Sequence, residues 1–339
     1  MTGIEGRRER IERFIAGASG GDVRIDRIAR LDGGAIQENW GIDAAIDGAE
    51  PAALVLRKNA PSGVSVSHGR AEEFAVLRAA FDAGVTVPEP LWLCTDPDVV
   101  GDDFYIMRRV AGVAARHVVA KQLSADGGEE IAARLGAELA RIHTIVPPRD
   151  DLGFLAPPPA TPGQAAIELY RGMLDRLGTA RPVLEWGLRG LERAPPAAAP
   201  PVLCHRDFRT GNYMVADGVL TGILDWEFAG WGDPHEDIAW FCAACWRSGN
   251  FDLAAGGIAP RQVFCEAYEE ASGRRIDTRS VAYWEVMAHI RWAAIALEQG
   301  QRHVSGAEPS LSLALTGRQI AEIEYEILPL MRSLEDMAA

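Results

Sequence analysis

The sequence predicts an α+β protein with two lobes: a small lobe over residues 1–107, built on a five-stranded antiparallel sheet, and a large, mainly helical lobe over residues 108–339. Five short β-rich segments crowd the first 107 residues, whereas amphipathic helical patterns dominate the remainder. A single hairpin pattern, bracketed by polar side chains, interrupts the helical part and indicates where the function resides.

The composition is that of a globular protein with two domains or one two-lobed domain: 339 residues, 48% hydrophobic and 24% charged. A formal net charge of −14 argues against nucleic acid or an anionic membrane as the main partner. No apolar run reaches the roughly 18 residues of a membrane span. The charged first 13 residues and an odd count of five Cys predict a reducing cytoplasm. The oligomeric state is left open.

Alternation and turn residues place the strands of the small lobe. The expected segments are residues 23–31, 40–46, 52–58, 91–94 and 103–107. A first helix is expected over residues 4–16. Another is expected over residues 67–83, with Phe74, Leu77 and Phe81 as its apolar stripe.

The third strand brings charge to the sheet. Its alternation puts Val55 and Arg57 on one face and Lys58 on the other. Glu73 lies four residues before Leu77, beside the buried stripe of the next helix, where an acid needs a partner. We expect that partner to be Arg57, although an ordinary charged strand end is the other interpretation.

Three polar residues bracket the hairpin expected over residues 213–224. Asp207 and Asn212 precede it, in the pattern H-x-D-x-x-x-x-N, and Asp225 follows it directly. Because a short hairpin brings its outer ends together, these three side chains are expected to converge. Carboxylate and amide oxygens suit Mg²⁺ and not zinc, and a second carboxylate nearby can take a proton from a hydroxyl. These are the components of phosphoryl transfer, although Asp and Asn are also ordinary turn residues.

The order of motifs carries a family resemblance. Asp225-Trp226-Glu227 stands where protein kinases carry D-F-G, and Gly232-Asp233-Pro234 follows. This stretch resembles the aminoglycoside phosphotransferase and choline kinase branch of the protein-kinase-like fold. Within that branch it is most similar to a broad bacterial group, which also resembles the kinase-like domain attached to some acyl-CoA dehydrogenases.

The resemblance implies a two-lobed protein-kinase-like fold with ATP and Mg²⁺ bound between the lobes. It implies that Asp207 accepts or orients the proton of the substrate hydroxyl and that Asn212 and Asp225 hold Mg²⁺. Arg57 would meet the phosphates and pair with Glu73, with Lys58 as the alternative on the other strand face.

The resemblance also implies residues for the rest of the nucleotide. Val55 would cover adenine, Gly34 would belong to a glycine-containing loop over the phosphates, and the backbone of the hinge at Met107 and Arg109 would meet adenine. A plain hairpin is the alternative at Gly34, because the protein-kinase G-x-G-x-x-G is absent. The family usually has Gly where this chain has Arg206.

Four further residues have expected roles. By resemblance, His205 is structural and Asp237 hydrogen-bonds the backbone of the catalytic loop, while Glu227 touches substrate or a second metal unless it is a surface acid. Arg291 recurs with apolar residues on one face of a helix, so it needs an anion. That anion is an internal acid, such as Glu227 or Asp237, or else a substrate carboxylate or phosphate.

The function predicted is therefore transfer of the ATP γ-phosphate to a hydroxyl of a small molecule. The alternatives are a nucleotide-binding pseudoenzyme that regulates another protein, a protein kinase, and an aminoglycoside kinase that confers resistance. Intact Asp207, Asn212 and Asp225 count against a pseudoenzyme, and the missing A-P-E segment counts against a protein kinase. A neutral or anionic acceptor, such as a hydroxy acid or its CoA ester, is expected, and aminoglycosides are expected to be poor acceptors.

Overall fold

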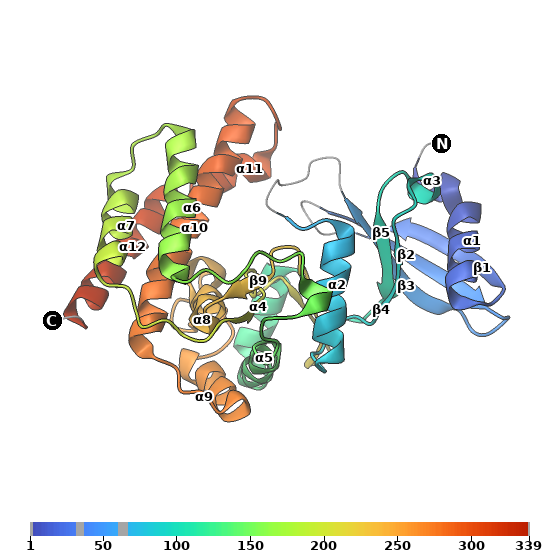
Figure 1. Ribbon diagram of the computed structural model, residues 1–339, viewed down its shortest axis with the longest axis horizontal. Helices are drawn as coiled ribbons and strands as arrows, with labels where there is room; N and C mark the ends of the chain where they lie inside the picture. The colour runs from blue at the N-terminus through green and yellow to red at the C-terminus, as the bar shows by residue number, and fades with distance from the viewer. Residues whose placement is uncertain (1–2, 32–36, 60–66, 338–339) are drawn as a thin grey trace. The chain divides into compact units, whose positions relative to one another are not determined.

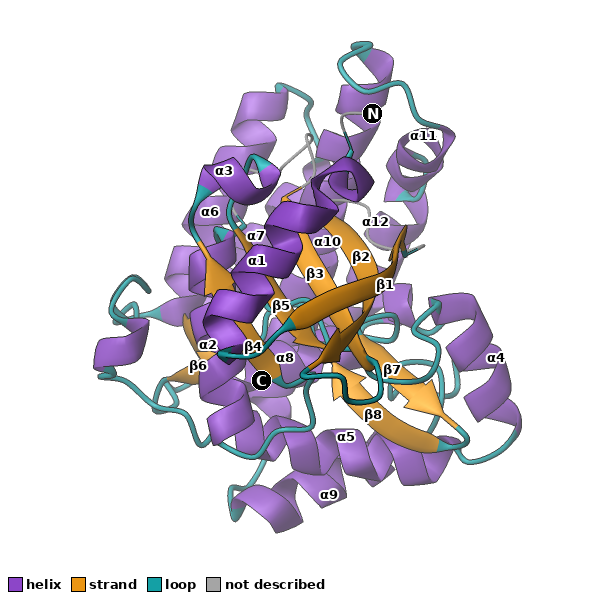
Figure 2. Ribbon diagram, turned by 90° about the vertical axis from the view of Figure 1, so that its right-hand side faces the viewer, coloured by secondary structure: helices purple, strands orange, loops and turns teal. Residues whose placement is uncertain are grey.

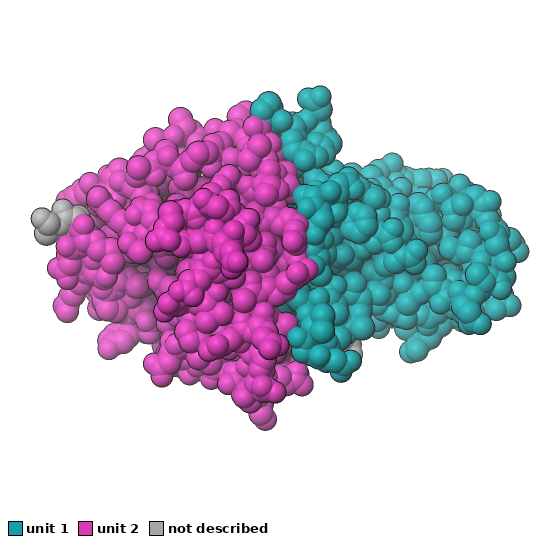
Figure 3. Space-filling model, turned by 90° about the horizontal axis from the view of Figure 1, so that it is seen from below, with its two compact units in different colours: residues 1–115, 148–155, 211–229 teal, residues 116–147, 156–210, 230–339 magenta. Residues whose placement is uncertain are grey.

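The computed structural model describes residues 3–31, 37–59 and 67–337. The chain divides into two units, coloured separately in Figure 3. Unit 1 comprises Met1–Ala115, Pro148–Leu155 and Gly211–Ala229; unit 2 comprises Arg116–Pro147, Ala156–Thr210 and Gly230–Ala339. The hairpin therefore belongs to the unit that contains the N-terminal sheet. The predicted lobe boundary at residues 107 and 108 stays a prediction.

Unit 1 is built on the five-stranded antiparallel sheet that the sequence predicts (Figure 2). The strands follow one another across the sheet in the order β1-β2-β3-β5-β4. Their bounds are β1 Val23–Arg30, β2 Gln37–Ile46, β3 Ala52–Asn59, β4 Pro90–Cys94 and β5 Phe104–Arg108. Each differs from its predicted range by three residues or fewer at either end.

Helices cover the two faces of this sheet (Figure 1). On one face α1 (Arg8–Ser19), which follows a 3-10 turn at Ile4–Arg7, packs its isoleucines against Leu54 and Leu56 of β3. On the other face lies α2 (Arg70–Asp82), whose Glu73 pairs with Arg57 of β3. The strand period of two thus separates an apolar core from a charged face.

Helix α2 differs from its prediction in two ways. It begins at Arg70 and not at residue 67, because Gly69 caps it: the Gly69 N–H donates to Glu72 Oε2 at 2.8 Å. Phe74 and Phe81 are only half-buried, whereas Glu73 is buried among the residues facing the sheet. Leu77 of the predicted stripe is buried as expected, and Glu73, expected beside that stripe, is buried as well.

The hairpin of unit 1 comprises β7 (Tyr213–Ala216) and β8 (Val219–Ile223). Its two-residue turn has φ of 49° at Asp217 and 75° at Gly218, the left-handed values that such a tight hairpin turn requires. At the open end, the Leu224 N–H donates to the Asn212 carbonyl at 2.8 Å. The predicted hairpin is confirmed. The shorter elements of unit 1 are α3 Pro97–Val100 and the 3-10 turn Asp150–Leu152.

Unit 2 is mainly helical. Its helices are α4 Arg116–Ala125, α5 Gly128–Ile142, α6 Pro162–Leu177, α7 Pro182–Arg193, α8 Pro234–Cys242, α9 Arg261–Ser272, α10 Thr278–Val304, α11 Leu311–Gly317 and α12 Ile320–Asp336, with a 3-10 turn at Ala244–Trp246. Two short strands, β6 (Val202–Cys204) and β9 (Gly230–Gly232), pair antiparallel. The long α10 packs against α6, α7, α8 and α12 (Figure 1).

One close approach in unit 2 depends on a glycine. A Cβ added to Gly136 of α5 would lie 2.4 Å from the Phe264 carbonyl of α9, so only glycine lets these two helices meet at this distance. Within the described ranges, none of the helices is both long and apolar enough to cross a lipid bilayer.

Candidate active site

The two predicted metal ligands lie together at the open end of the hairpin. Asn212 directly precedes β7, and one residue, Leu224, separates Asp225 from the end of β8. Asn212 is buried, whereas the Asp225 side chain keeps 30% of its surface exposed. Asp225 has φ of 62°, a left-handed backbone in which Asp is among the more tolerated residues. The donor set is one amide and one carboxylate, whose hard oxygens fit Mg²⁺.

Arg57 joins Asp225 to α2. Its Nη2 lies 2.8 Å from Asp225 Oδ1 and 3.0 Å from Glu73 Oε1, and its Nε donates to Glu73 Oε2 at 3.1 Å. Burial works to lower the pKa of Arg57, but the two carboxylates outweigh it and raise that pKa, so the guanidinium stays charged. Lys58 on the opposite face pairs instead with Glu38 at 3.7 Å. The expected Arg57–Glu73 ion pair is confirmed.

Arg70 and Gln37 extend this network and were not anticipated. Arg70 Nη1 donates to Glu73, and its Nη2 lies 3.6 Å from Glu227 Oε2. Gln37 Nε2 donates to the same Glu227 oxygen at 2.6 Å. Glu227 is 5% exposed, so the surface-acid alternative is wrong, and burial raises its pKa. We call Arg57, Arg70, Glu73, Asp225, Glu227 and Gln37 the unit 1 polar cluster.

The expected adenine-side residues lie on β3 and β5. Val55 pairs with Met107 across the ladder, so the two are direct neighbours. Arg109 follows β5; its N–H donates to the Ala53 carbonyl at 3.0 Å, and its guanidinium pairs with Asp43 at 2.5 Å. The predicted Gly34 lies outside the described residues.

Asp207 lies in unit 2, in the loop after β6. Its Oδ1 accepts hydrogen bonds from Arg209 Nε at 3.0 Å and from Trp240 Nε1 at 3.1 Å. The backbone N–H of Asp207 donates to His205 Nδ1 at 3.2 Å, which agrees with a structural role for His205. The carboxylate is therefore held in one orientation, with 13% of the side-chain surface exposed.

Asp237 fixes the backbone of this loop. Asp233 caps α8 and Pro234 begins it, which places Asp237 in the first turn. The two Asp237 oxygens accept the N–H groups of His205 and Arg206, each at 2.7 Å. Several donors thus act on one buried carboxylate and, despite its burial, lower its pKa. The predicted contact of Asp237 with the loop backbone is present.

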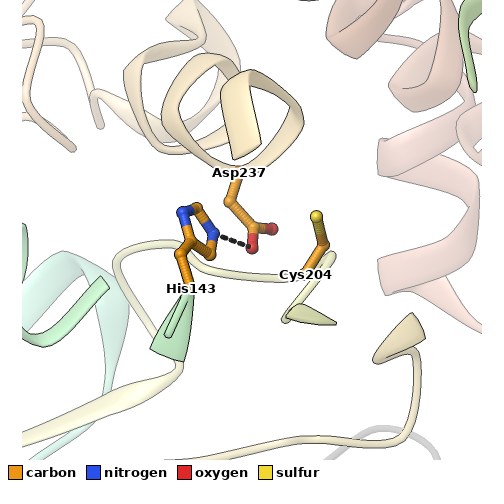
Figure 4. A group of neighbouring side chains, drawn as sticks. All are labelled: His143, Cys204 and Asp237. Carbon is orange, nitrogen blue, oxygen red and sulfur yellow. Dashed lines mark hydrogen bonds and ion pairs between the residues drawn. The ribbon is translucent and has the colours of Figure 1, made fainter. Parts of the chain in front are cut away.

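His143, Cys204 and Asp237 form a group with metal-ligand chemistry (Figure 4). Their ligand atoms lie within 4.8 Å of one another, but each already has a hydrogen-bond partner. His143 bridges Tyr268 and Asp237, and burial raises the pKa of the Cys204 thiol. We therefore assign this group to the scaffold of the loop. His143, at the end of α5, is buried.

Two arginines of unit 2 differ from expectation. Arg206 has φ of 62°, which explains why glycine suits this position, and its side chain donates to the Trp231 carbonyl and lies 3.5 Å from Glu236. The guanidinium of Arg291 lies 4.3 Å from the centroid of the Trp240 ring, a cation–π contact. Among the described residues, the internal acid that Arg291 acts on electrostatically is Glu236, in place of the expected Glu227 or Asp237.

Removing one carboxylate from the unit 1 polar cluster is expected to destabilise the fold. Glu73→Leu leaves the Arg57 and Arg70 guanidinium groups buried without their shared partner, which costs about 3–5 kcal/mol of unfolding free energy. The measurement is urea unfolding followed by circular dichroism. As a matched control, Glu89→Leu breaks the exposed Arg108–Glu89 pair and should cost about 1 kcal/mol or less. Equal losses in the two variants would contradict this account of the cluster.

Three solved structures illustrate the similarity in fold. A Ralstonia eutropha protein named as a candidate aminoglycoside phosphotransferase aligns with a TM-score of 0.75 and 21% identity, over 96% of this chain and 98% of its own. A choline/ethanolamine kinase family protein from Mesorhizobium loti aligns with a TM-score of 0.63 and 20% identity, over 98% of this chain and 99% of its own. Spectinomycin phosphotransferase, crystallised with ADP and spectinomycin, aligns with a TM-score of 0.63 and 12% identity, over 96% of this chain and 98% of its own. These similarities show the protein-kinase-like fold.

Curated relatives are similar in sequence to part of this chain. Acyl-CoA dehydrogenase family member 10 of Mus musculus is 29% identical over 210 residues, which are 60% of this chain and 19% of the mouse protein. Family member 11 of Gallus gallus is 30% identical over 202 residues, 56% of this chain and 25% of the chicken protein. The chain thus matches about a fifth to a quarter of the length of these two relatives.

The family model described as the APH phosphotransferase enzyme family matches residues 27–283. That span begins in β1 and ends in α10, so it includes both the unit 1 polar cluster and the loop that carries Asp207. It covers well over half of the sequence, and the chain therefore belongs to the phosphotransferase enzyme family.

Proposed function

We propose that the protein transfers the γ-phosphate of ATP to a hydroxyl group of a small molecule. The observation that carries the proposal is the orientation of Asp207, whose carboxylate is held by Arg209 and Trp240 in a loop with a fixed backbone. A carboxylate so held can accept the proton of an acceptor hydroxyl, or orient that hydroxyl for attack on phosphorus.

Unit 1 supplies the nucleotide side of the proposed reaction. Asn212 and Asp225 are the proposed ligands of Mg²⁺, which when bound neutralises negative charge on phosphate oxygens. Arg57, held between Glu73 and Asp225, is the proposed phosphate contact, because a planar guanidinium can bind phosphate oxygens in pairs. Val55, Met107 and the backbone at Arg109 are the proposed neighbours of adenine.

The acceptor proposed is a neutral or anionic hydroxyl compound, with a hydroxy acid or its CoA ester as examples. Arg209 bonds Asp207 directly, and Arg291 stacks on Trp240, the second donor to that carboxylate. Two guanidinium groups next to the proposed base favour an acceptor that carries a carboxylate or phosphate over a polycation.

A panel of hydroxyl compounds incubated with Mg²⁺ and ATP tests the proposal. We expect ADP to form only when a suitable acceptor is present, at a rate that saturates with acceptor concentration. The competing pseudoenzyme would bind ATP without acceptor-dependent ADP formation, and that result would refute the proposal.

Aminoglycosides are expected to be poor acceptors. The positive charges of the Arg209 and Arg291 guanidinium groups should repel kanamycin-like polycations. The kcat/KM for these compounds should therefore lie far below that of the best anionic acceptor in the panel. Arg291→Ala should lower kcat/KM for the anionic acceptor by roughly tenfold, the loss of one charged contact. Efficient kanamycin phosphorylation that is unaffected by Arg291→Ala would contradict this choice of acceptor.

A further inference from the structure

Unit 2 contains a cavity of about 470 Å³. Helix α4 provides Arg116 to its wall, and the remaining residues come from the loop after α8, from α10 and from the start of α12. Ile323 forms a buried part of the wall. Phe251 and Tyr325 also line it, with 61% and 70% of their surfaces exposed, which leaves two aromatic faces for a ligand.

One wall residue is a buried hydrogen-bond acceptor that has no partner in the described part of the chain. His289 is 1% exposed, and its Nδ1 lies 2.7 Å from the Glu285 carbonyl. A carbonyl can only accept, so Nδ1 carries the hydrogen and Nε2 carries a lone pair. Burial lowers the pKa of His289, which keeps the ring neutral at pH 7. Among the described residues Nε2 has no hydrogen-bond partner, so a ligand N–H or O–H group that reaches it would satisfy a buried acceptor.

Arg116 lies on another part of the wall. Its guanidinium stacks over the Trp246 ring at 5.8 Å, and its Nη1 donates to the Cys245 carbonyl at 3.1 Å. Within the described ranges it forms no ion pair with a carboxylate. Partial burial and the neighbouring Arg209 lower the pKa of Arg116, although the residue as a whole is exposed.

The same tryptophan connects the cavity to Asp207. Arg209, which donates to Asp207, stacks on the Trp246 ring at 4.7 Å, on the indole that also carries Arg116. Two guanidinium groups thus share one ring between the proposed base and the cavity. The cavity's two acids, Glu322 and Glu326, both belong to α12, and Glu326 acts electrostatically on His289. The cavity therefore has a cationic part at α4 and a hydrogen-bond-accepting part formed by His289 of α10 and the two acids of α12.

The cavity loop is fixed by a buried ion pair. Arg247 donates to the Phe251 carbonyl at 3.1 Å and to Glu285 Oε1 at 3.1 Å, and it also donates to the Cys242 carbonyl. Glu285 is further paired with Arg261 at 2.7 Å. The loop that presents Phe251 is thus tied to α10, the helix that carries His289, which indicates a site formed before a ligand arrives.

We propose that this cavity binds the remote part of the acceptor, an amphipathic carboxylate or phosphate. It would place an anionic group at Arg116, in addition to the one proposed near Arg209 and Arg291, an apolar body against Phe251 and Tyr325, and a hydrogen-bond donor at His289. The proposal rests on the proposed function, since it places the rest of the acceptor in the cavity that Trp246 connects to Asp207. It adds a requirement that the acceptor have a donor group at its apolar end.

Binding of three simple probes tests the cavity without any phosphoryl transfer. 8-Aminooctanoate carries an anion, an apolar body and a donor; octanoate lacks the donor, and octylamine lacks the anion. By ligand-observed NMR we expect saturable binding of 8-aminooctanoate, about fivefold tighter than either control, the value of one hydrogen bond or ion pair. Equal affinity of the three probes, or no saturable binding, would overturn the proposal.

Substitutions in the cavity should change these preferences separately. Arg116→Gln should remove the preference for 8-aminooctanoate over octylamine, and His289→Phe should remove the preference over octanoate. Arg189→Gln, which alters an exposed arginine on α7, is the matched control and should change neither preference. If His289→Phe does not fold, Tyr325→Ala at an exposed position provides the second variant, with weaker binding of all three probes. Unchanged affinities in the cavity variants would place the probes elsewhere.

Kinetics then distinguish this inference from the proposed function. On the acceptor found in the panel, Arg116→Gln should raise KM by about fivefold with kcat unchanged, because it removes binding remote from the reacting hydroxyl. Asp207→Asn should bind 8-aminooctanoate normally. An unchanged KM together with lost probe binding would show that the cavity is not part of the acceptor site. If no compound is phosphorylated while the probes bind as expected, the proposed phosphotransferase function is refuted, and binding of amphipathic anions by the cavity is retained.

Discussion

Asp207→Asn is expected to lower the rate of phosphoryl transfer by roughly 10²–10⁴. The amide keeps the shape of the side chain and can still accept from Arg209 and Trp240, but it cannot take a proton from the acceptor hydroxyl. Nucleotide binding should be retained, because the proposed contacts to ATP belong to unit 1. The measurements are kcat for the acceptor found in the panel and ATP affinity by calorimetry.

The control for this substitution is Asp217→Asn. Asp217 occupies the turn between β7 and β8 with positive φ, a position where Asn is equally suitable, so both activity and stability should be unchanged. Transfer at the wild-type rate in Asp207→Asn would remove Asp207 from the proposed role. A parallel loss in Asp217→Asn would show that the assay reports folding and not chemistry.

Asp225→Ala is expected to abolish the dependence of nucleotide binding on Mg²⁺. The substitution removes one of the two proposed oxygen ligands and leaves Arg57 paired with Glu73 alone. Mg²⁺ held by Asn212 and Asp225 would neutralise charge on the phosphates, so ATP should bind the variant equally weakly with and without the metal. Transfer should fall by at least roughly 10²-fold, since charge on the phosphate is no longer neutralised.

Calorimetry of ATP binding with Mg²⁺ and with EDTA tests this expectation. In the wild type, Mg²⁺ should tighten ATP binding, and Asp26→Ala, at an exposed acid on β1, should behave like the wild type. Identical ATP affinity in the presence and absence of Mg²⁺, in both wild type and Asp225→Ala, would refute the metal assignment.

The elements that local chemistry determines could be predicted from the sequence. Strand alternation placed Arg57 and not Lys58 on the face toward α2, where it meets Glu73. The Asp217-Gly218 turn fixed the hairpin, and with it the proximity of Asn212 to the residues that follow β8. In each case a rule that acts over a few residues determined the outcome.

Contacts between residues far apart in the chain could not be predicted in this way. Gln37 and Glu227 lie 190 positions apart in the sequence. No local pattern indicates that the Gln37 amide will donate a hydrogen bond to the Glu227 carboxylate. Helical periodicity gave Arg291 its face on α10, but not Trp240 as the neighbour that the guanidinium stacks on. Arg70 alone left a sequence signal, because it lies three residues before Glu73 on one helix.

Direct detection of the product tests the central claim. Wild-type protein, ATP labelled at the γ-phosphate, Mg²⁺ and the best acceptor of the panel are incubated together, and the products are identified by ³¹P NMR and chromatography. The account predicts a labelled phosphate monoester of the acceptor, formed in equal amount with ADP and absent in Asp207→Asn. ATP that binds but yields no labelled ester, or label released only as inorganic phosphate, would contradict it.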